Sequence, residues 1–246
     1  MRILAIVSYN GMNYQGWQKQ PNKNTIQDEI EAVLSQYFNR PISIYGAGRS
    51  DAGVHASGQR FHFDVDVDDL DLDRLMYSLN CMLPKDIKID DLELVDDEFH
   101  ARFSAKEKIY VYTIFEGAKD VFFYPVMWCV PEKIDKKLLE ECLTYFKGRH
   151  CFQNFTSKEE DEDGFYRTIF EIKVDTSADK VIHIIFRGDG FMRYMIRYLV
   201  GIAVEYAKGK LLPEEVLDLL DPAKERNIVS AKAPACGLML ADVIYD

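Results

Sequence analysis

Residues 46–59 read GAGRSDAGVHASGQ, and this stretch decides how the rest of the chain is interpreted. It places the carboxylate of Asp51 two positions after Arg49 and four positions before His55. A neighbouring arginine favours the ionised carboxylate that a nucleophile or base requires. Glycine admits backbone angles and close ligand approach that other residues forbid, and the stretch contains Gly46, Gly48, Gly53 and Gly58. The pattern fits a catalytic aspartate on a loop, but it also fits a turn aspartate beside a surface arginine.

Outward from this loop, apolar patterning predicts strands and helices in both halves of the chain. In the first half we expect strands at residues 2–9, 42–45, 60–67 and 87–95, and helices at 25–38 and 70–82. In the second half we expect strands at 109–115, 169–174, 181–186 and 238–244, and helices at 136–146, 192–208 and 213–220. This order predicts an α+β protein with two domains, residues 1–104 and 105–246. Each would carry helices on one face of a mainly antiparallel sheet, with the active site in a cleft between the domains.

The charge distribution decides whether a nucleic acid is a plausible partner. The net charge is −11, which argues against one, but residues 61–100 contain 13 acidic against 3 basic residues. The run EEDED at 159–163 adds five more acids. The remainder holds 23 acidic against 27 basic residues, which is compatible with a basic face for phosphates.

The spacing of the cysteines and histidines indicates the cellular compartment and whether the protein binds a metal. The five cysteines are scattered and never form a C-x-x-C pair, which favours a reducing, cytoplasmic setting over a disulfide framework or zinc site. The five histidines also lack metal-ligand spacing, so we expect no metal. No apolar run approaches the length of a membrane-spanning helix, so we expect no membrane partner.

Two further segments combine aromatic and basic residues, a pattern typical of single-stranded nucleic-acid binding. Residues 9–22, YNGMNYQGWQKQPN, contain Trp17 and Lys19; Trp17 suits base stacking or the core of a domain. Residues 99–112, FHARFSAKEKIYVY, offer a basic track that leads to Tyr110, itself a stacking platform or a sheet residue. The basic residues of that track are Arg102, Lys106 and Lys108.

A third segment, GDGFMRYMIRYLVG at 188–201, places Arg193 and Arg197 four residues apart on one face of an apolar helix. An arginine in such surroundings usually has an anionic partner, and Asp51 is a candidate. The alternative is an exposed arginine at a helix edge. His55 suits acid–base work with Asp51, although a structural or substrate-orienting role fits better because no serine or cysteine nucleophile accompanies the pair.

Taken in order, these segments, with FTSK at 155–158 and APACGLMLADV at 233–243, resemble the TruA-type tRNA pseudouridine synthases. The resemblance runs from the first strand to the last. Ser50 stands where the family usually has threonine, and Asn10 where it usually has aspartate.

The resemblance implies an isomerase that converts uridine to pseudouridine at positions 38, 39 and 40 in the anticodon arm of tRNA. It implies a homodimer with the pseudouridine synthase fold and no cofactor. Asp51 corresponds to the family's essential aspartate, Tyr110 to its active-site tyrosine, and Arg197 to the arginine that pairs with the aspartate. Arg49 would assist flipping of the target base.

Two other functions remain open on the sequence alone. A catalytically weak relative would bind RNA without forming product, as the acidic net charge would suit. An unrelated hydrolase would use Asp51 with His55 on a small substrate. A synthase acting on another RNA is a third variant.

Overall fold

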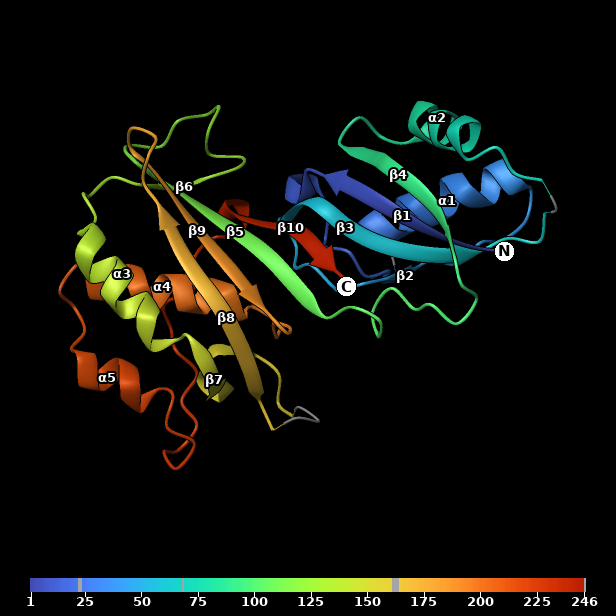
Figure 1. The fold of residues 1–246 in the computed structure, drawn as a ribbon. Helices are drawn as coiled ribbons and strands as arrows, with labels where there is room; N and C mark the ends of the chain where they lie inside the picture. The colour runs from blue at the N-terminus through green and yellow to red at the C-terminus, as the bar shows by residue number, and fades with distance from the viewer. Residues whose placement is uncertain (22–23, 68, 161–163, 246) are drawn as a thin grey trace. The chain divides into compact units, whose positions relative to one another are not determined.

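The computed structural model describes residues 1–21, 24–67, 69–160 and 164–245, so part of the acidic run at 159–163 lies outside the described residues. The chain divides into two compact units, Met1–Lys106 with Met239–Asp246, and Glu107–Leu238 (Figure 1). Each unit combines helices with a mainly antiparallel sheet, which confirms the α+β class. The last strand follows the second unit in sequence but is grouped with the first, whereas we expected it in the second domain.

The first unit is built on a central antiparallel pair of strands, β1 (Arg2–Tyr9) and β3 (His55–Asp64). Antiparallel β4 (Ile87–Val95) flanks β1, and the short antiparallel β2 (Tyr45–Gly46) pairs with β3. The last strand, β10 (Leu238–Ile244), runs parallel to β3. The remaining elements are η1 (Gly11–Asn13), α1 (Ile26–Phe38) and α2 (Leu72–Met82).

Strand alternation creates the core of this unit. Ile3 pairs with Phe63 and Ala5 with Phe61, and all four side chains have 0% exposure. Helix α1 buries Ile26, Ile30 and Leu34, a spacing that places them on one face. The Thr25 hydroxyl accepts the N–H of Asp28 and donates to its carboxylate, so the expected cap is confirmed.

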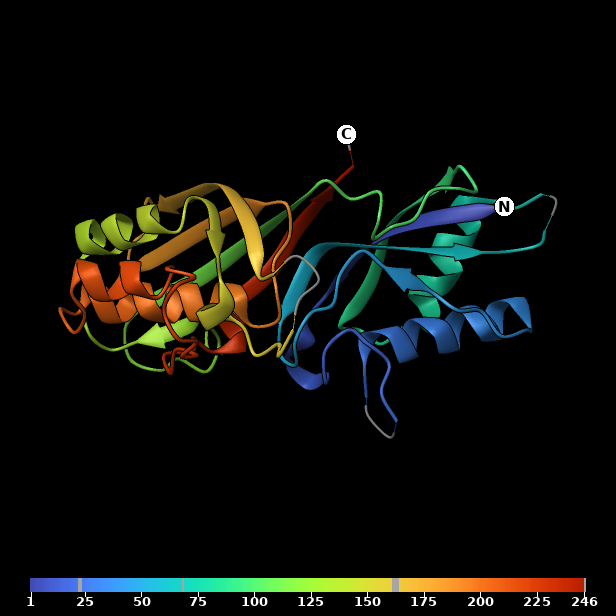
Figure 2. The same ribbon diagram turned by 90° about the horizontal axis from the view of Figure 1, so that it is seen from below.

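The second unit is built on antiparallel strands in the order β5–β9–β8–β7, of which β7, β8 and β9 are consecutive in sequence. Helices α3 and α4 lie side by side in both views (Figures 1 and 2). The strands are β5 (Glu107–Glu116), β6 (Trp128–Val130), β7 (Gly148–Cys151), β8 (Tyr166–Asp175) and β9 (Val181–Gly188), with β6 parallel to β5. The helices are α3 (Lys136–Tyr145), α4 (Met195–Ala207) and α5 (Pro213–Asp218), with 3-10 turns η2 (Gln153–Phe155) and η3 (Ala235–Gly237).

Some expected boundaries were wrong, for local reasons. Helix α4 begins at Met195 rather than residue 192 because Tyr194 adopts a left-handed conformation, with φ of 64°. Strand β3 begins five residues earlier than expected, and the strand expected at 42–45 is confined to β2. Strands β6 and β7 were not expected at all.

Over the described residues, no helix combines the length and apolar character that crossing a membrane requires.

Candidate active site

The loop that carries Asp51 is fixed by hydrogen bonds to two neighbouring segments. The backbone N–H of Ala47 donates to the carbonyl of Arg60, at 2.7 Å, where the loop leaves β2. Gln59, with 0% exposure, donates its side-chain amide to the carbonyl of Gly48 at 3.0 Å. The backbone N–H of Trp17 donates to the carbonyl of Ser50 at 3.1 Å. The loop backbone is therefore positioned by β3 and by the residues around Trp17 that follow η1, which we call the Trp17 segment.

Ser50 is also held through its side chain. Its hydroxyl lies 2.8 Å from the phenol oxygen of Tyr9, at the end of β1. Burial raises the pKa of Tyr9 to about 12, so this phenol stays protonated throughout the neutral range. Beyond the aspartate, the N–H of Gly53 donates to the carbonyl of Tyr14 and that of Val54 to the carbonyl of Asp51. Asp51 itself is half-buried, on a loop anchored before and after it.

His55 begins β3 and is 6% exposed. Its Nδ1 accepts the backbone N–H of Gly11 at 3.2 Å, which makes Nε2 the protonated nitrogen of a neutral ring. This bond ties the histidine to η1. Such a ring is placed to support the Asp51 loop and is a poor candidate for a solvent-accessible acid–base pair.

Trp17 belongs to the core of the first unit, at 2% exposure. Its ring lies 6.1 Å from that of Tyr9 and 6.0 Å from that of Phe61. A Cβ atom at Gly46 would fall 2.5 Å from the indole nitrogen, so the first glycine of the loop leaves room for this ring. The ring has no free face for a base, and the stacking interpretation of Trp17 is therefore replaced by a structural one.

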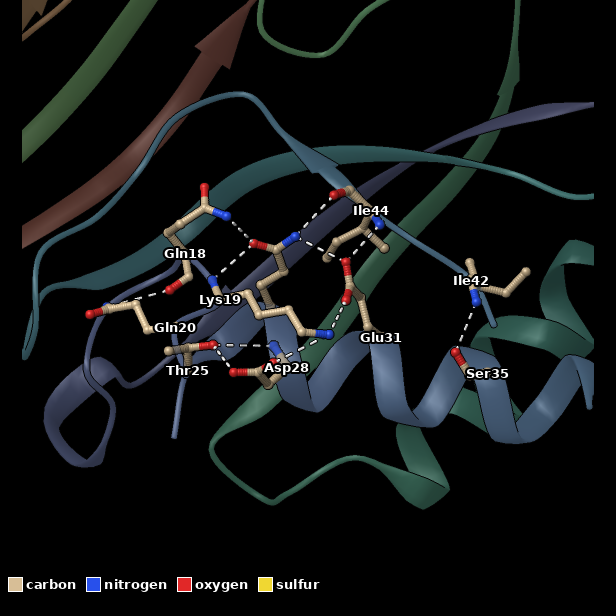
Figure 3. Close-up of polar contacts among 10 residues, drawn as sticks. Gln18, Lys19, Gln20, Thr25, Asp28, Glu31, Ser35, Ile42 and Ile44 are labelled. Carbon is tan, nitrogen blue, oxygen red and sulfur yellow. Dashed lines mark hydrogen bonds and ion pairs between the residues drawn. The ribbon is translucent and has the colours of Figure 1, made fainter. Parts of the chain in front are cut away.

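A buried polar network holds the segment around Lys19 to helix α1 (Figure 3). Gln27 accepts the backbone N–H of Lys19 at 3.0 Å and the side-chain amide of Gln18 at 2.9 Å. Its own amide donates to the carboxylate of Glu31 at 2.9 Å and to the carbonyl of Ile44 at 3.2 Å.

Glu31 completes the network at 8% exposure. Its Oε1 accepts the backbone N–H of Ile44 at 3.1 Å, and its Oε2 pairs with the ammonium of Lys19 at 3.0 Å. Asp28 lies 3.6 Å from the same ammonium. The network thus joins α1, the Trp17 segment and the chain that leads into the Asp51 loop. Lys19 remains more than half exposed at its side chain, but its charge is shared between two carboxylates.

The other candidates of the first unit lie outside its core. Arg49 is exposed on the loop, two residues before Asp51. Arg102 is exposed and lies over the ring of Phe103 at 5.5 Å, while its backbone N–H donates to Nδ1 of His100. Lys106 is exposed and its backbone N–H donates to the carbonyl of Ile244.

The second unit holds the remaining candidates. Tyr110, on β5, is 8% exposed and packs edge-on against Phe191, with ring centroids 5.3 Å apart. Lys108 is half-buried on the same strand. Tyr110 is therefore a sheet residue whose ring contacts the segment leading into α4.

Arg197 is set by a reciprocal pair of hydrogen bonds. Its Nε donates to the carbonyl of Ala233 at 2.8 Å, and its carbonyl accepts the N–H of Ala233 at 2.9 Å. The phenol of Tyr112, on β5, donates to the next carbonyl, that of Pro234, at 2.8 Å. Burial raises the pKa of Tyr112 well above its usual range, so its phenol stays protonated and able to donate this bond. Arg197 and Glu205 are the residues of α4 that are not buried.

The structure groups Arg49, Asp51, His55, Trp17 and Lys19 in the first unit, and Lys108, Tyr110, Arg193 and Arg197 in the second. Within the described residues, His, Cys, Asp and Glu side chains form no group of three that could hold a metal ion.

The sequence interpretation missed Gln27, Glu31 and Gln59. A Gln and a Glu four residues apart beside an apolar helix face were the available signal.

The chain matches a family model described as tRNA pseudouridine synthase over residues 5–104 and 143–246. It is similar over its full length to curated proteins called tRNA pseudouridine synthase A. The protein of Exiguobacterium sp. is 38% identical over 245 residues, covering 100% of this chain and 98% of that one. The protein of Thermodesulfovibrio yellowstonii is 38% identical over 256 residues, covering 100% of both. The protein of Dictyoglomus turgidum is 41% identical over 241 residues, covering 97% of both.

Proposed function

The chain belongs to the tRNA pseudouridine synthase family, and we propose that it isomerises uridine to pseudouridine in the anticodon arm of tRNA, at positions 38, 39 and 40, without a cofactor. The observation that carries the site assignment is the half-buried Asp51, on a loop anchored before and after it to β1, β3 and the Trp17 segment. Such anchoring presents a carboxylate in a fixed position, as covalent or base catalysis requires.

The reaction needs no external reactant beyond that carboxylate and the substrate. The reaction breaks the bond between N1 of uracil and C1′ of the ribose, turns the base and joins C5 to C1′. Atoms and oxidation level are conserved, so no redox partner or energy source is needed. We propose that Asp51 acts either as the nucleophile at C1′ or as a base that removes a ribose proton.

We propose supporting roles for three further side chains. Arg197 would stabilise the ionised carboxylate of Asp51, and Tyr110 would stack on the displaced uracil. Arg49, exposed beside the aspartate, would take the space left by the flipped base and so offset its unstacking, which costs a few kcal/mol. The position of Arg197 supports its role, since its guanidinium Nε donates to the carbonyl of Ala233 and its backbone carbonyl accepts the N–H of Ala233.

For the RNA backbone we propose Lys19, Arg102, Lys106, Lys108 and Arg193 as phosphate contacts. Lys19, Arg102, Lys106 and Arg193 are exposed, which supports the assignment. His55 would orient the loop. We leave Trp17 out, because its ring is buried. We also propose that the enzyme works as a cytoplasmic homodimer, with a domain boundary near residues 104–108.

The test uses tRNA transcripts labelled with tritium at C5 of uridine and the purified protein alone. The C5 hydrogen leaves when C5 joins the ribose, so tritium release reports the reaction. We expect release without added metal or nucleotide, and chemical mapping should locate product at positions 38–40. The isosteric variant Asp51→Asn should bind tRNA and release no tritium. Turnover by this variant would overturn the site assignment, and product elsewhere in the tRNA would overturn the positions.

A further inference from the structure

The ring of Tyr194 is surrounded by three cationic side chains. The guanidinium carbons of Arg193 and Arg197 lie 4.7 and 5.3 Å from its centroid, and the ammonium of Lys232 lies 4.3 Å from it. Lys232 also lies 5.8 Å from the ring of Tyr198. Arg193 donates to the phenol oxygen of Tyr194 at 2.9 Å. Positions 193–198 and 232 are far apart in sequence, so the fold itself creates this cluster.

The cluster is held by the backbone on both sides. Tyr194 is the N-cap of α4, in the left-handed region that residues other than glycine rarely enter, with φ of 64°. The carbonyl of Arg193 accepts the hydroxyl of Thr156, which has 0% exposure, at 3.1 Å. A non-glycine residue in this conformation persists only where surrounding contacts enforce it.

Lys232 is placed by its two neighbours. Ala233 is bonded in both directions to Arg197. Ala231 passes so close to α4 that a Cβ atom at Gly201 would lie 2.2 Å from its carbonyl oxygen. With both neighbours against the helix, the exposed Lys232 side chain starts from a fixed backbone position beside the Tyr194 ring.

Two of the three charges in the cluster, those of Arg193 and Lys232, can still attract an anion. Among the described residues, no carboxylate forms an ion pair with Arg193 or with Lys232. The like charges of Arg193 and Lys232 beside one ring repel each other, and the ring face offsets this only in part. An anion placed between them would relieve the repulsion.

We propose that Arg193, Tyr194 and Lys232 bind a phosphate of the RNA backbone. This rests on the proposed function, since tRNA supplies the phosphate. A guanidinium binds phosphate through paired N–H donors and an ammonium through charge. The phenol of Tyr194 accepts from Arg193, which leaves its own hydrogen for an acceptor oxygen. Lys232 and Tyr194 thereby join Arg193 as contacts for the substrate.

The experiment measures the equilibrium affinity for unmodified tRNA at several salt concentrations, with tritium release measured in parallel. Lys232→Ala and Arg193→Ala should each lower the slope of log affinity against log salt by about 0.7 to 1, the value for one lost phosphate contact. Affinity at low salt should fall several-fold. Tyr194→Phe, which keeps the ring and loses the hydroxyl, should weaken binding less.

Two variants control for charge and folding. Lys224→Ala removes the same charge from an exposed lysine that pairs with Asp218, and its slope should equal that of the wild type. Lys232→Arg should restore both slope and affinity. Because Lys232 is exposed, Lys232→Ala should keep the wild-type melting temperature; if it does not, Lys232→Gln provides the same comparison with a longer side chain.

The outcomes separate this proposal from the previous one. An unchanged slope in Lys232→Ala, with wild-type tritium release, overturns the phosphate contact alone. Binding with the expected slopes but no tritium release overturns the proposed activity alone. An unchanged slope with weakened self-association in Lys232→Ala shows that the cluster holds a carboxylate of a second copy instead. A melting-temperature rise in inorganic phosphate at constant ionic strength that Lys232→Ala loses, together with an unchanged tRNA slope, shows a site for free phosphate rather than RNA.

Discussion

The backbone N–H of Trp17 donates a 3.1 Å hydrogen bond to the carbonyl of Ser50, the residue that precedes Asp51. A core residue is thus bonded directly to the loop that bears the proposed catalytic carboxylate. Disturbing the interior of the first unit should therefore change catalysis as well as stability.

Trp17→Phe tests this coupling. The smaller ring leaves a cavity beside Gly46 and Phe61, and we expect a loss of about 1–3 kcal/mol in the free energy of unfolding. Because the ring is buried, tRNA affinity of the folded variant should stay near that of the wild type while kcat falls. Tyr77→Ala, at a 73% exposed position, should change neither quantity appreciably. A pure loss of tRNA affinity would restore the stacking role for Trp17.

Gly16→Ala tests how closely the loop backbone is packed. Gly16 has φ of +91°, and a Cβ atom there would lie 2.5 Å from the Ser50 carbonyl oxygen. Gly209 has a similar φ of +70° with nothing within 4 Å of its Cβ position, so Gly209→Ala measures the backbone cost alone, about 1–2 kcal/mol. We expect Gly16→Ala to lose more stability than Gly209→Ala and to lower kcat at least tenfold. Equal stability losses and equal kcat in Gly16→Ala and Gly209→Ala would show that the loop backbone shifts to accommodate the Cβ atom without loss of stability or activity.

Glu31→Gln tests the network of Figure 3. The carboxylate accepts from Ile44, Gln27 and Lys19, whereas a carboxamide offers one acceptor oxygen and sets an NH2 group against donors. We expect a loss of about 1–3 kcal/mol in unfolding free energy and a roughly tenfold lower kcat. Glu225→Gln, at an exposed position, should resemble the wild type in both assays. A stability loss with wild-type kcat would confine the network to a structural role.

His62 should make the protein sensitive to acid. Burial lowers its pKa to about 4, with Arg2 contributing, and its Nδ1 accepts the N–H of Ala101. The unfolded chain takes up this proton near pH 6.5 and the folded state only near pH 4. Stability is therefore full above about pH 6.5 and falls by about 1–3 kcal/mol as the pH drops to 4.

Urea unfolding at a series of pH values measures this effect. The variant His62→Asn should show a flatter dependence between pH 6.5 and 4, since an amide oxygen can replace Nδ1 without titrating. His150→Asn, at a half-buried position of the second unit, serves as the control. Equal slopes in His62→Asn and the wild type would assign the acid sensitivity to other groups.

Much of the secondary structure was predictable, because local patterns produce it. Helix α1 followed from apolar spacing and the Thr25 cap, both of which are present. Strand β3 was truncated in the prediction because residues 55–59 include Ser57 and Gly58, which look like a loop. They become strand by pairing with β1 and β10, and those partners lie far away in sequence.

The site was predictable at its motif residues and not at their supports. Gly-rich spacing and family resemblance pointed to Asp51, but no local pattern shows that Gln59 holds its loop or that Glu31 accepts from Ile44. No sequence pattern indicates a role for Lys232, because its position beside Tyr194 depends on how the chain after α5 returns to α4. Such contacts depend on tertiary packing.

The parallel pairing of β10 with β3 also orders events during synthesis. The ribosome must translate all of the second unit before it reaches residues 239–245, which complete the first. Until then β3 lacks one neighbour, and Lys106 and Ser57 lack their bonds to Ile244 and Ala241. The growing chain therefore carries its Asp51 loop on a first unit that still lacks β10. That unit can be completed only after the whole second unit has been synthesised.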